Sequence, residues 1–211
     1  MELLKKIINP GKTAVLVIDI QKDYCSPEGK ITEVRKFDMS PIEKIIGPLK
    51  NFLEKAREAN VPIIFTRMIE NTADMEENAK IKRVADGNPL ELCVPGTDGF
   101  EYYKIRPEKG DFEIIKKSYD AFSNEELEKI LKKIRAENII LCGVYTSVCV
   151  DTTLRTAYTK GYNVIVPKDL VAMPKERWDQ HEATLKIWDI IFAHLADSRE
   201  IISVWNGRRG I

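Results

Sequence analysis

The stretch N-I-I-L-C-G-V-Y-T-S-V-C-V-D-T-T-L-R-T-A-Y-T-K-G (138–161) decides the fold, because it combines a buried strand with a helix that follows it directly. Residues 138–144 are a continuous apolar run of strand length, and a helical pattern extends from about Ser147 to Gly161. A second apolar run, Y-N-V-I-V-P (162–167), begins immediately after that glycine. Strand, helix and strand in this order are typical of a parallel sheet.

The same alternation continues on both sides of this stretch. Further strands are predicted at 13–20, 61–67, 111–117 and 200–204, and helices at 40–60, 123–135 and 175–196. Ser40 with Pro41 marks the start of the first helix, and the capping box Ser123 to Glu126 marks the start of the second. Residues 68–110 are rich in polar residues, Pro and Gly, and we expect long loops there with one short helix. The sequence therefore predicts an α/β fold: one domain over residues 1–211, a Rossmann-like parallel β-sheet of about six strands, and helices on both faces.

Composition excludes several classes of function. Lys+Arg and Asp+Glu both number 33, so no net field favours nucleic acid or an anionic membrane. No apolar run reaches the ~18–20 residues that span a bilayer, and the first residues lack the pattern of a signal peptide. The four cysteines form no C-x-x-C pair and are interpreted as free thiols of a cytoplasmic protein.

Two charged residues stand at the ends of predicted strands. Asp19 ends an otherwise apolar run, and a buried carboxylate there needs a cation or hydrogen-bond donors. Lys116 and Lys117 end the run 111–117, and only one of them can point into the crevice beyond the sheet, because side chains alternate along a strand. Periodicity does not say which lysine that is.

Cys149 lies just after the strand 138–144, in the predicted first turn of the following helix. The positive end of a helix dipole and its free N–H groups stabilise a thiolate, and the same groups can hold an oxyanion. A buried structural cysteine is the alternative, and Cys142 within the strand is interpreted as one. We interpret Cys149 as a nucleophile.

Three segments carry a family resemblance. V-I-D-I-Q-K-D-Y (17–24) resembles the D-x-Q-x-D-[FY] segment of isochorismatase-like cysteine hydrolases. K-K-S-Y-D-A-F (116–122) is similar to their K-x-x-[YF]-[SD]-A-F, and G-V-Y-T-S-V-C-V (143–150) to their G-V-x-T-x-x-C-V. All three occur in family order and spacing, over nearly the whole chain. The turn P-G-T-D-G-F (95–100) further resembles the carbamoylsarcosine and ureidoacrylate amidohydrolase branch.

The resemblance implies roles for these residues. It makes Asp19 the general base, Lys116 rather than Lys117 the charged partner, and Cys149 the nucleophile of a catalytic triad. It assigns the oxyanion hole to the backbone N–H groups of Tyr145 and Cys149, with a cis peptide expected at Val144–Tyr145. It also implies a homo-oligomer, a dimer or tetramer.

The expected reaction is hydrolysis of a C–N bond in a small amide, ureido or N-carbamoyl substrate through a thioester. Gln21, Tyr24 and Phe122 are expected to contact this substrate, and Arg67 to bind a substrate carboxylate. Nicotinamidases of the family bind a metal through histidines after the second strand, but residues 66–83 contain none, so no metal site and no other cofactor are expected.

Other functions stay open at this point. Nicotinamidase-like amidase activity is disfavoured, and isochorismatase-type vinyl-ether hydrolysis is an alternative, although such enzymes generally lack the cysteine. A non-catalytic binding protein on the same fold is a further alternative. Dinucleotide binding is disfavoured, because no G-x-G-x-x-G follows the first strand. His181 and His194, both in the predicted last helix, are interpreted as surface or packing residues.

Overall fold

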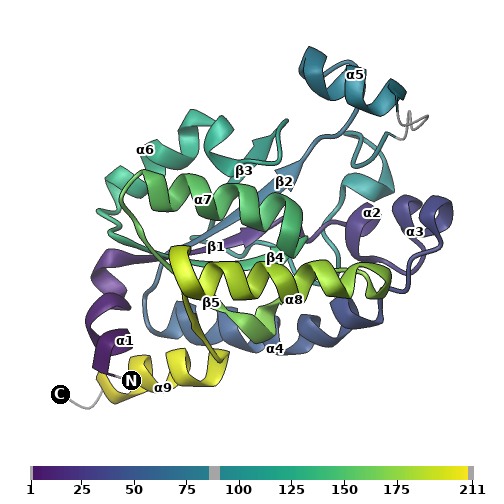
Figure 1. Cartoon of the computed structure of the whole chain (residues 1–211). Coiled ribbons are helices and arrows are strands. Elements are labelled where there is room, and N and C mark those ends of the chain that lie inside the picture. Colours follow the sequence, from purple (N-terminus) through teal and green to yellow (C-terminus); the bar gives the residue numbers. More distant parts are fainter. Residues whose placement is uncertain (1, 86–90, 209–211) are drawn as a thin grey trace.

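A computed structural model describes residues 2–85 and 91–208 of the chain. A parallel sheet with helices packed on both of its faces forms the body of the molecule (Figure 1). The strands are β1 (Thr13–Ile18), β2 (Ile63–Met68), β3 (Phe112–Lys116), β4 (Asn138–Val144), β5 (Asn163–Pro167), β6 (Val171–Ala172) and β7 (His194–Ala196). The helices are α1 (Glu2–Ile7), α2 (Lys22–Cys25), α3 (Lys30–Arg35), α4 (Ser40–Glu58), α5 (Glu77–Ala85), α6 (Glu125–Lys133), α7 (Asp151–Thr159), α8 (Trp178–Ile187) and α9 (Ser198–Arg208). The α/β fold expected from the sequence is confirmed.

The strand order is β3-β2-β1-β4-β5-β7, and the two-residue strand β6 pairs with β4. The chain runs outward from β1 through β2 to β3, then returns to β4 on the other side of β1 and runs outward again. This reversal opens a crevice beyond the carboxyl ends of β1 and β4, where open α/β sheets bind their ligands. The register places Ile18 beside Gly143 and Met68 beside Lys116.

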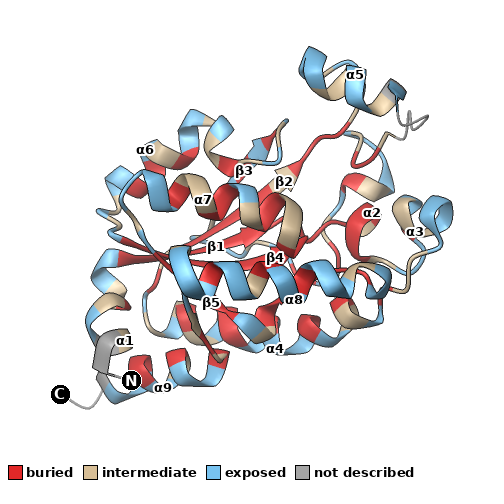
Figure 2. Cartoon of the chain, viewed as in Figure 1, coloured by how far each residue is buried: buried red, intermediate tan, exposed pale blue. Residues whose placement is uncertain are grey.

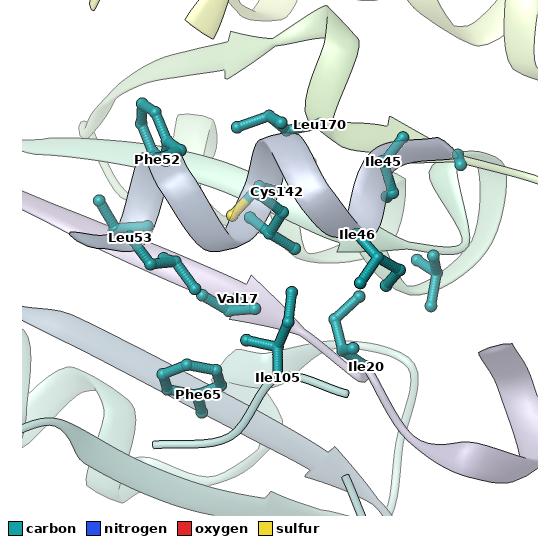
Figure 3. Packing of buried hydrophobic residues seen from close by; sticks show 14 of the residues in the cluster. Val17, Ile20, Ile45, Ile46, Phe52, Leu53, Phe65, Ile105, Cys142 and Leu170 are labelled. Atoms are coloured by element: carbon teal, nitrogen blue, oxygen red, sulfur yellow. The ribbon is translucent and has the colours of Figure 1, made fainter. Parts of the chain in front are cut away.

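Alternate residues of each central strand enter different cores. Val15 and Val17 face α4 and α9, whereas Leu16 and Ile18 face α6 and α7. The sheet between these layers is buried along most of its length (Figure 2). Figure 3 shows the first core from close by, with Phe52 and Leu53 of α4 lying against the sheet.

Gly143 is required where β4 approaches β1. Its φ of +113° lies in the region that glycine adopts freely, and a Cβ there would lie 2.3 Å from the carbonyl oxygen of Ile18. The glycine of the G-V-Y-T segment therefore permits the close approach of the two strands whose ends carry Cys149 and Asp19.

Several predicted elements differ in the structure. Residues 200–204, predicted as a strand, belong to helix α9, and the last strand is His194–Ala196 inside the predicted helix 175–196. Helix α6 is capped by Asn124, whose side chain accepts a hydrogen bond from the Glu126 N–H, rather than by Ser123. Ser40 lies inside the first turn of α4, after its cap Met39. The short helix expected within 68–110 is α5, and residues 86–90 of that stretch lie outside the described residues.

None of the described helices is both long enough and apolar enough to cross a bilayer.

Candidate active site

Asp19 lies one residue beyond β1, at the reversal of the strand order. Its backbone has a φ of +48°, a left-handed conformation that aspartate tolerates better than most residues. Thr66 of β2 donates a hydrogen bond from Oγ1 to Asp19 Oδ1 at 2.6 Å, and Thr66 Oγ1 accepts one from the Asp19 N–H at 3.2 Å. The second carboxylate oxygen lies 2.7 Å from Lys116 Nζ. The buried carboxylate is thus held by a threonine on one oxygen and a cation on the other.

Lys116 reaches this carboxylate from two strands away. Neighbouring strands lie about 4.8 Å apart, so β3 is roughly 10 Å from β1, and the lysine side chain must extend across β2. Its ammonium also donates hydrogen bonds to the carbonyl oxygens of Ser118 at 3.0 Å and Tyr119 at 3.3 Å. Burial by itself would lower the pKa of Lys116, but the negative charge of Asp19, and that of Cys149 once its thiol is ionised, outweigh burial and raise it. Lys116 is therefore a charged group in a dry environment.

Lys117 points the other way. Its side chain is exposed and its Nζ pairs with Asp74 on the surface. The alternation of side chains along β3 thus turns one lysine toward Asp19 and the other toward solvent.

Cys149 lies in a π-helical turn, Thr146–Val150, that connects β4 to α7. Asp19 and Lys116 lie close enough to its thiol for both to shift its pKa. Burial raises the pKa of Cys149 to about 12; Lys116 lowers it and Asp19 raises it. The sequence led us to expect that the helix end and the lysine favour the thiolate, but desolvation outweighs them, so the resting thiol is protonated at neutral pH.

The turn that precedes Cys149 has a fixed shape. The peptide bond between Val144 and Tyr145 is cis, and the Tyr145 carbonyl accepts hydrogen bonds from the N–H groups of Val148 and Val150. The Tyr145 hydroxyl donates to the carbonyl of Tyr24 at 2.7 Å, which ties the turn to helix α2.

A cavity of about 150 Å³ opens above Cys149. Its wall consists largely of aromatic and aliphatic side chains, among them Tyr24, Tyr119 and Tyr145. Four charged residues also line it: Arg35 from α3, Arg83 from α5, Arg177 and Glu70. The volume suits a ligand of only a few heavy atoms, and the excess of arginine suits an anion.

Glu70 neutralises one of these arginines. Its buried carboxylate pairs with Arg83 and accepts hydrogen bonds from the Tyr24 hydroxyl at 2.5 Å and the Tyr119 hydroxyl at 3.0 Å. Within residues 2–85 and 91–208, neither Arg35 nor Arg177 forms an ion pair, and Arg177 lies over the ring of Phe37. These two guanidinium groups remain available to a negatively charged ligand.

The structure brings some of the expected site residues together and leaves others elsewhere. Cys149, Tyr145 and Tyr24 line the cavity, whereas Asp19 and Lys116 do not line it and pair with each other beside the Cys149 thiol. Gln21 is buried beside it, but its amide is engaged by the backbone of Met68 and Phe100, so it anchors the loop that follows β1.

Arg67 and Phe122 lie away from the cavity. Arg67 pairs with Glu113 at 2.6 Å and packs over the rings of Phe100 and Tyr102, because its side chain leaves β2 on the face opposite to Thr66. Phe122 stacks on Tyr162, with ring centroids 6.0 Å apart, in the layer of helices α6 and α7. Neither residue lines this cavity, so a contact of either with the substrate stays a prediction.

Sequence reasoning missed Thr66, Glu70, Arg35 and Arg177. Thr66 and Glu70 had a visible signal, since each is a polar residue in or just after an apolar strand run. Arg35 and Arg177 had none, because each lies in a polar stretch that resembles ordinary surface. Cys25 and Cys93, which the sequence places in loops, are buried, and burial raises the pKa of both thiols.

Among the residues that the structure describes, no cluster of three or more His, Cys, Asp or Glu side chains has the geometry of a metal site.

Comparisons with known proteins identify the family of the chain. Residues 13–200 match the family model of the isochorismatase domain. Ureidoacrylate amidohydrolase RutB of Caulobacter segnis is 28% identical over 193 residues, which cover 85% of this chain and 80% of that protein. The crystal structure of a cysteine hydrolase from Pseudomonas syringae pv. phaseolicola superposes with a TM-score of 0.81 at 25% identity, over 95% of each chain. N-carbamoylsarcosine amidase from Thermoplasma acidophilum, with a TM-score of 0.69 at 22% identity over 89% of this chain and 96% of that one, shares the fold. The family model spans most of the chain, so the protein belongs to the isochorismatase family.

Proposed function

We propose that this protein is a cysteine-dependent amidohydrolase that cleaves a C–N bond of a small ureido, N-carbamoyl or amide acid. The observation that carries the proposal is the buried pair of Asp19 and Lys116 beside the thiol of Cys149, which lines a small cavity. The similarity to ureidoacrylate amidohydrolase RutB supports a ureido acid such as ureidoacrylate as substrate. The proposal includes a homo-oligomer in the cytoplasm.

The reaction begins with a neutral thiol. Asp19 removes the proton of Cys149 as sulfur attacks the substrate carbonyl, and the Lys116 ammonium stabilises the thiolate as it forms. The carbonyl oxygen becomes an oxyanion held by the N–H groups of Tyr145 and Cys149. The C–N bond then breaks, and Asp19 returns the proton to the leaving nitrogen. Water, deprotonated by Asp19, attacks the resulting thioester; the C–S bond breaks, the acid is released, and the proton on Asp19 returns to the Cys149 sulfur to restore the neutral thiol.

Arg35 and Arg177 would bind the substrate carboxylate. We expect Arg177→Met to raise KM for ureidoacrylate by about 10- to 100-fold, because a hydrogen bond to a charged group contributes about 1.5–3 kcal/mol. Hydrolysis of p-nitrophenyl acetate, which carries no charge, should change less than about threefold. Steady-state kinetics with both substrates measure the difference.

The matched control is Arg67→Met, which removes an arginine that pairs with Glu113 outside the cavity. Its KM for ureidoacrylate should stay at the wild-type value. A raised KM in Arg67→Met together with an unchanged KM in Arg177→Met would contradict the assignment of the anion site.

The proposed reaction needs no metal ion. After dialysis against a chelator, turnover of ureidoacrylate should remain within about 20% of the untreated enzyme, since Asp19 and Lys116 perform the proton transfer and charge stabilisation. The basis is the sequence 66–83, which lacks the histidines of metal-binding relatives. A loss of turnover that zinc or iron restores would overturn this part of the proposal.

A further inference from the structure

His181 of α8 is buried against the turn that carries Cys149. Its side chain is 4% exposed, and its Nδ1 lies 2.9 Å from the hydroxyl of Thr146, which is itself fully buried. The imidazole stacks on the indole of Trp178, three residues earlier in the same helix, with centroids 4.1 Å apart and ring planes 25° apart. The ring therefore has a fixed orientation, and its one described hydrogen-bond partner is Thr146.

Thr146 lies in the backbone turn that leads to Cys149. It follows Tyr145 directly and opens the π-helical turn in which Cys149 is the fourth residue. The two N–H groups proposed for the oxyanion hole, those of Tyr145 and Cys149, lie on either side of it in the chain. Because oxyanion donors must stay about 2.7–3.1 Å from the developing charge, a small displacement of this turn weakens both at once.

The turn is held from two directions. Tyr145 is tied to α2 through its hydroxyl, and Thr146 is tied to α8 through His181. Helix α8 lies across the front of the sheet in Figure 1, beside the carboxyl end of β4. His181 does not line the cavity. Any effect of His181 on the reaction therefore acts through its hydrogen bond to Thr146.

We propose that His181 is a positioning residue that fixes the oxyanion turn by its hydrogen bond to Thr146. The proposal rests on the proposed function. Burial lowers the pKa of His181, and this effect is larger than that of the Glu182 charge, which raises the pKa. The imidazole is therefore neutral at neutral pH, with one nitrogen as a hydrogen-bond donor and the other as an acceptor. A neutral imidazole can make this bond in either tautomer.

Two reactions of the same thiol test this role. Acyl transfer from p-nitrophenyl acetate passes through an oxyanion, whereas alkylation by iodoacetamide displaces iodide at a saturated carbon and forms none. We expect His181→Ala to lower kcat for p-nitrophenyl acetate about 10- to 100-fold and to leave KM unchanged. Complete loss of an oxyanion donor lowers kcat by ~10²–10³-fold, and a displaced turn should cause only part of that loss. The rate of Cys149 alkylation should stay within about twofold of wild type.

Two further variants isolate the hydrogen bond. His181→Asn keeps a polar group that can bond Thr146 and should recover most of the activity. Thr146→Val, of nearly the same shape, should show the loss seen in His181→Ala, and the double variant His181→Ala with Thr146→Val should lose no more than either single variant. If His181→Ala does not fold, as judged by circular dichroism, His181→Asn and Thr146→Val still decide the test.

Three results would overturn the proposal. These are an unchanged kcat in His181→Ala and Thr146→Val, additive losses in the double variant, or an equal fall of alkylation and acyl transfer. Each leaves the proposed function standing as long as Cys149→Ala is inactive. A fully active Cys149→Ala variant would instead overturn the proposed function itself.

Discussion

Replacement of Cys149 by alanine is expected to abolish ammonia release from ureidoacrylate, with a fall in kcat of at least about 10³-fold. Loss of the nucleophile from a catalytic unit typically removes most of the rate enhancement and leaves only what binding and the oxyanion hole supply. Cys149 lines the cavity, and Asp19 and Lys116 both act on the pKa of its thiol. Steady-state ammonia release measures the effect.

The matched control is Cys142→Ala, because Cys142 is buried in β4 and does not line the cavity. Its kcat should remain near the wild-type value. In a parallel experiment, rapid acid quench of the wild type with p-nitrophenyl acetate should give an acetyl group on the peptide that contains Cys149. Turnover by Cys149→Ala, or an acyl group on another residue, would contradict a thioester mechanism.

The second large effect is expected from one of two adjacent lysines. Lys116→Ala should lower kcat at least about 10²-fold, because it removes a buried cation 2.7 Å from Asp19 and leaves that carboxylate without its charged partner. Lys117→Ala should keep near-normal kcat, since Lys117 pairs with Asp74 at the surface. The reverse pattern would show that Lys117 is the functional residue.

Iodoacetamide labelling measures the effect of Lys116 on the pKa of the Cys149 thiol separately from its effect on turnover. Because the pKa of Cys149 is raised to about 12, the thiolate is the minor form at neutral pH, and the labelling rate should rise about tenfold per pH unit until the pH approaches 12. Lys116→Ala should slow labelling at a given pH, since the lysine lowers this pKa. Peptide mapping should find Cys149 modified before the other three thiols, because Cys25, Cys93 and Cys142 are completely buried. A labelling rate independent of pH would contradict the raised pKa.

The fold and the polar centre could be predicted because they depend on patterns that local sequence carries. Continuous apolar runs such as 13–18 indicated strands buried on both faces, and Asp19, Lys116 and Cys149 each follow such a run or end it. Periodicity could not choose between Lys116 and Lys117. Alternation along a strand places the two side chains on opposite faces of the sheet, but it does not say which of them faces the crevice. That choice needed the family resemblance.

The features that were not predicted correctly also have causes in the local sequence. The run E-I-I-S-V (200–204) is too short for its period to separate a strand from one turn of a buried helix, and Trp205 packs it against α4 as part of α9. The strand His194–Ala196 has three residues, fewer than any pattern can reveal. For Arg67 the sequence did not show which residues of the second strand face the crevice: Thr66 faces Asp19, so its neighbour in β2 faces the other side of the sheet.

The pairing of β1 with β4 joins segments about 125 positions apart in the chain, and it has a consequence for how the protein acquires activity. Contacts of such large sequence separation require closure of a long loop and therefore form after local structure. A ribosome-bound chain that has emerged only as far as β3 already contains Asp19 and Lys116 but lacks Cys149. Under the proposed mechanism, chemistry begins only when the second half of the sheet docks onto the first. We therefore expect the onset of turnover during refolding to coincide with completion of the sheet and to follow formation of the first compact state.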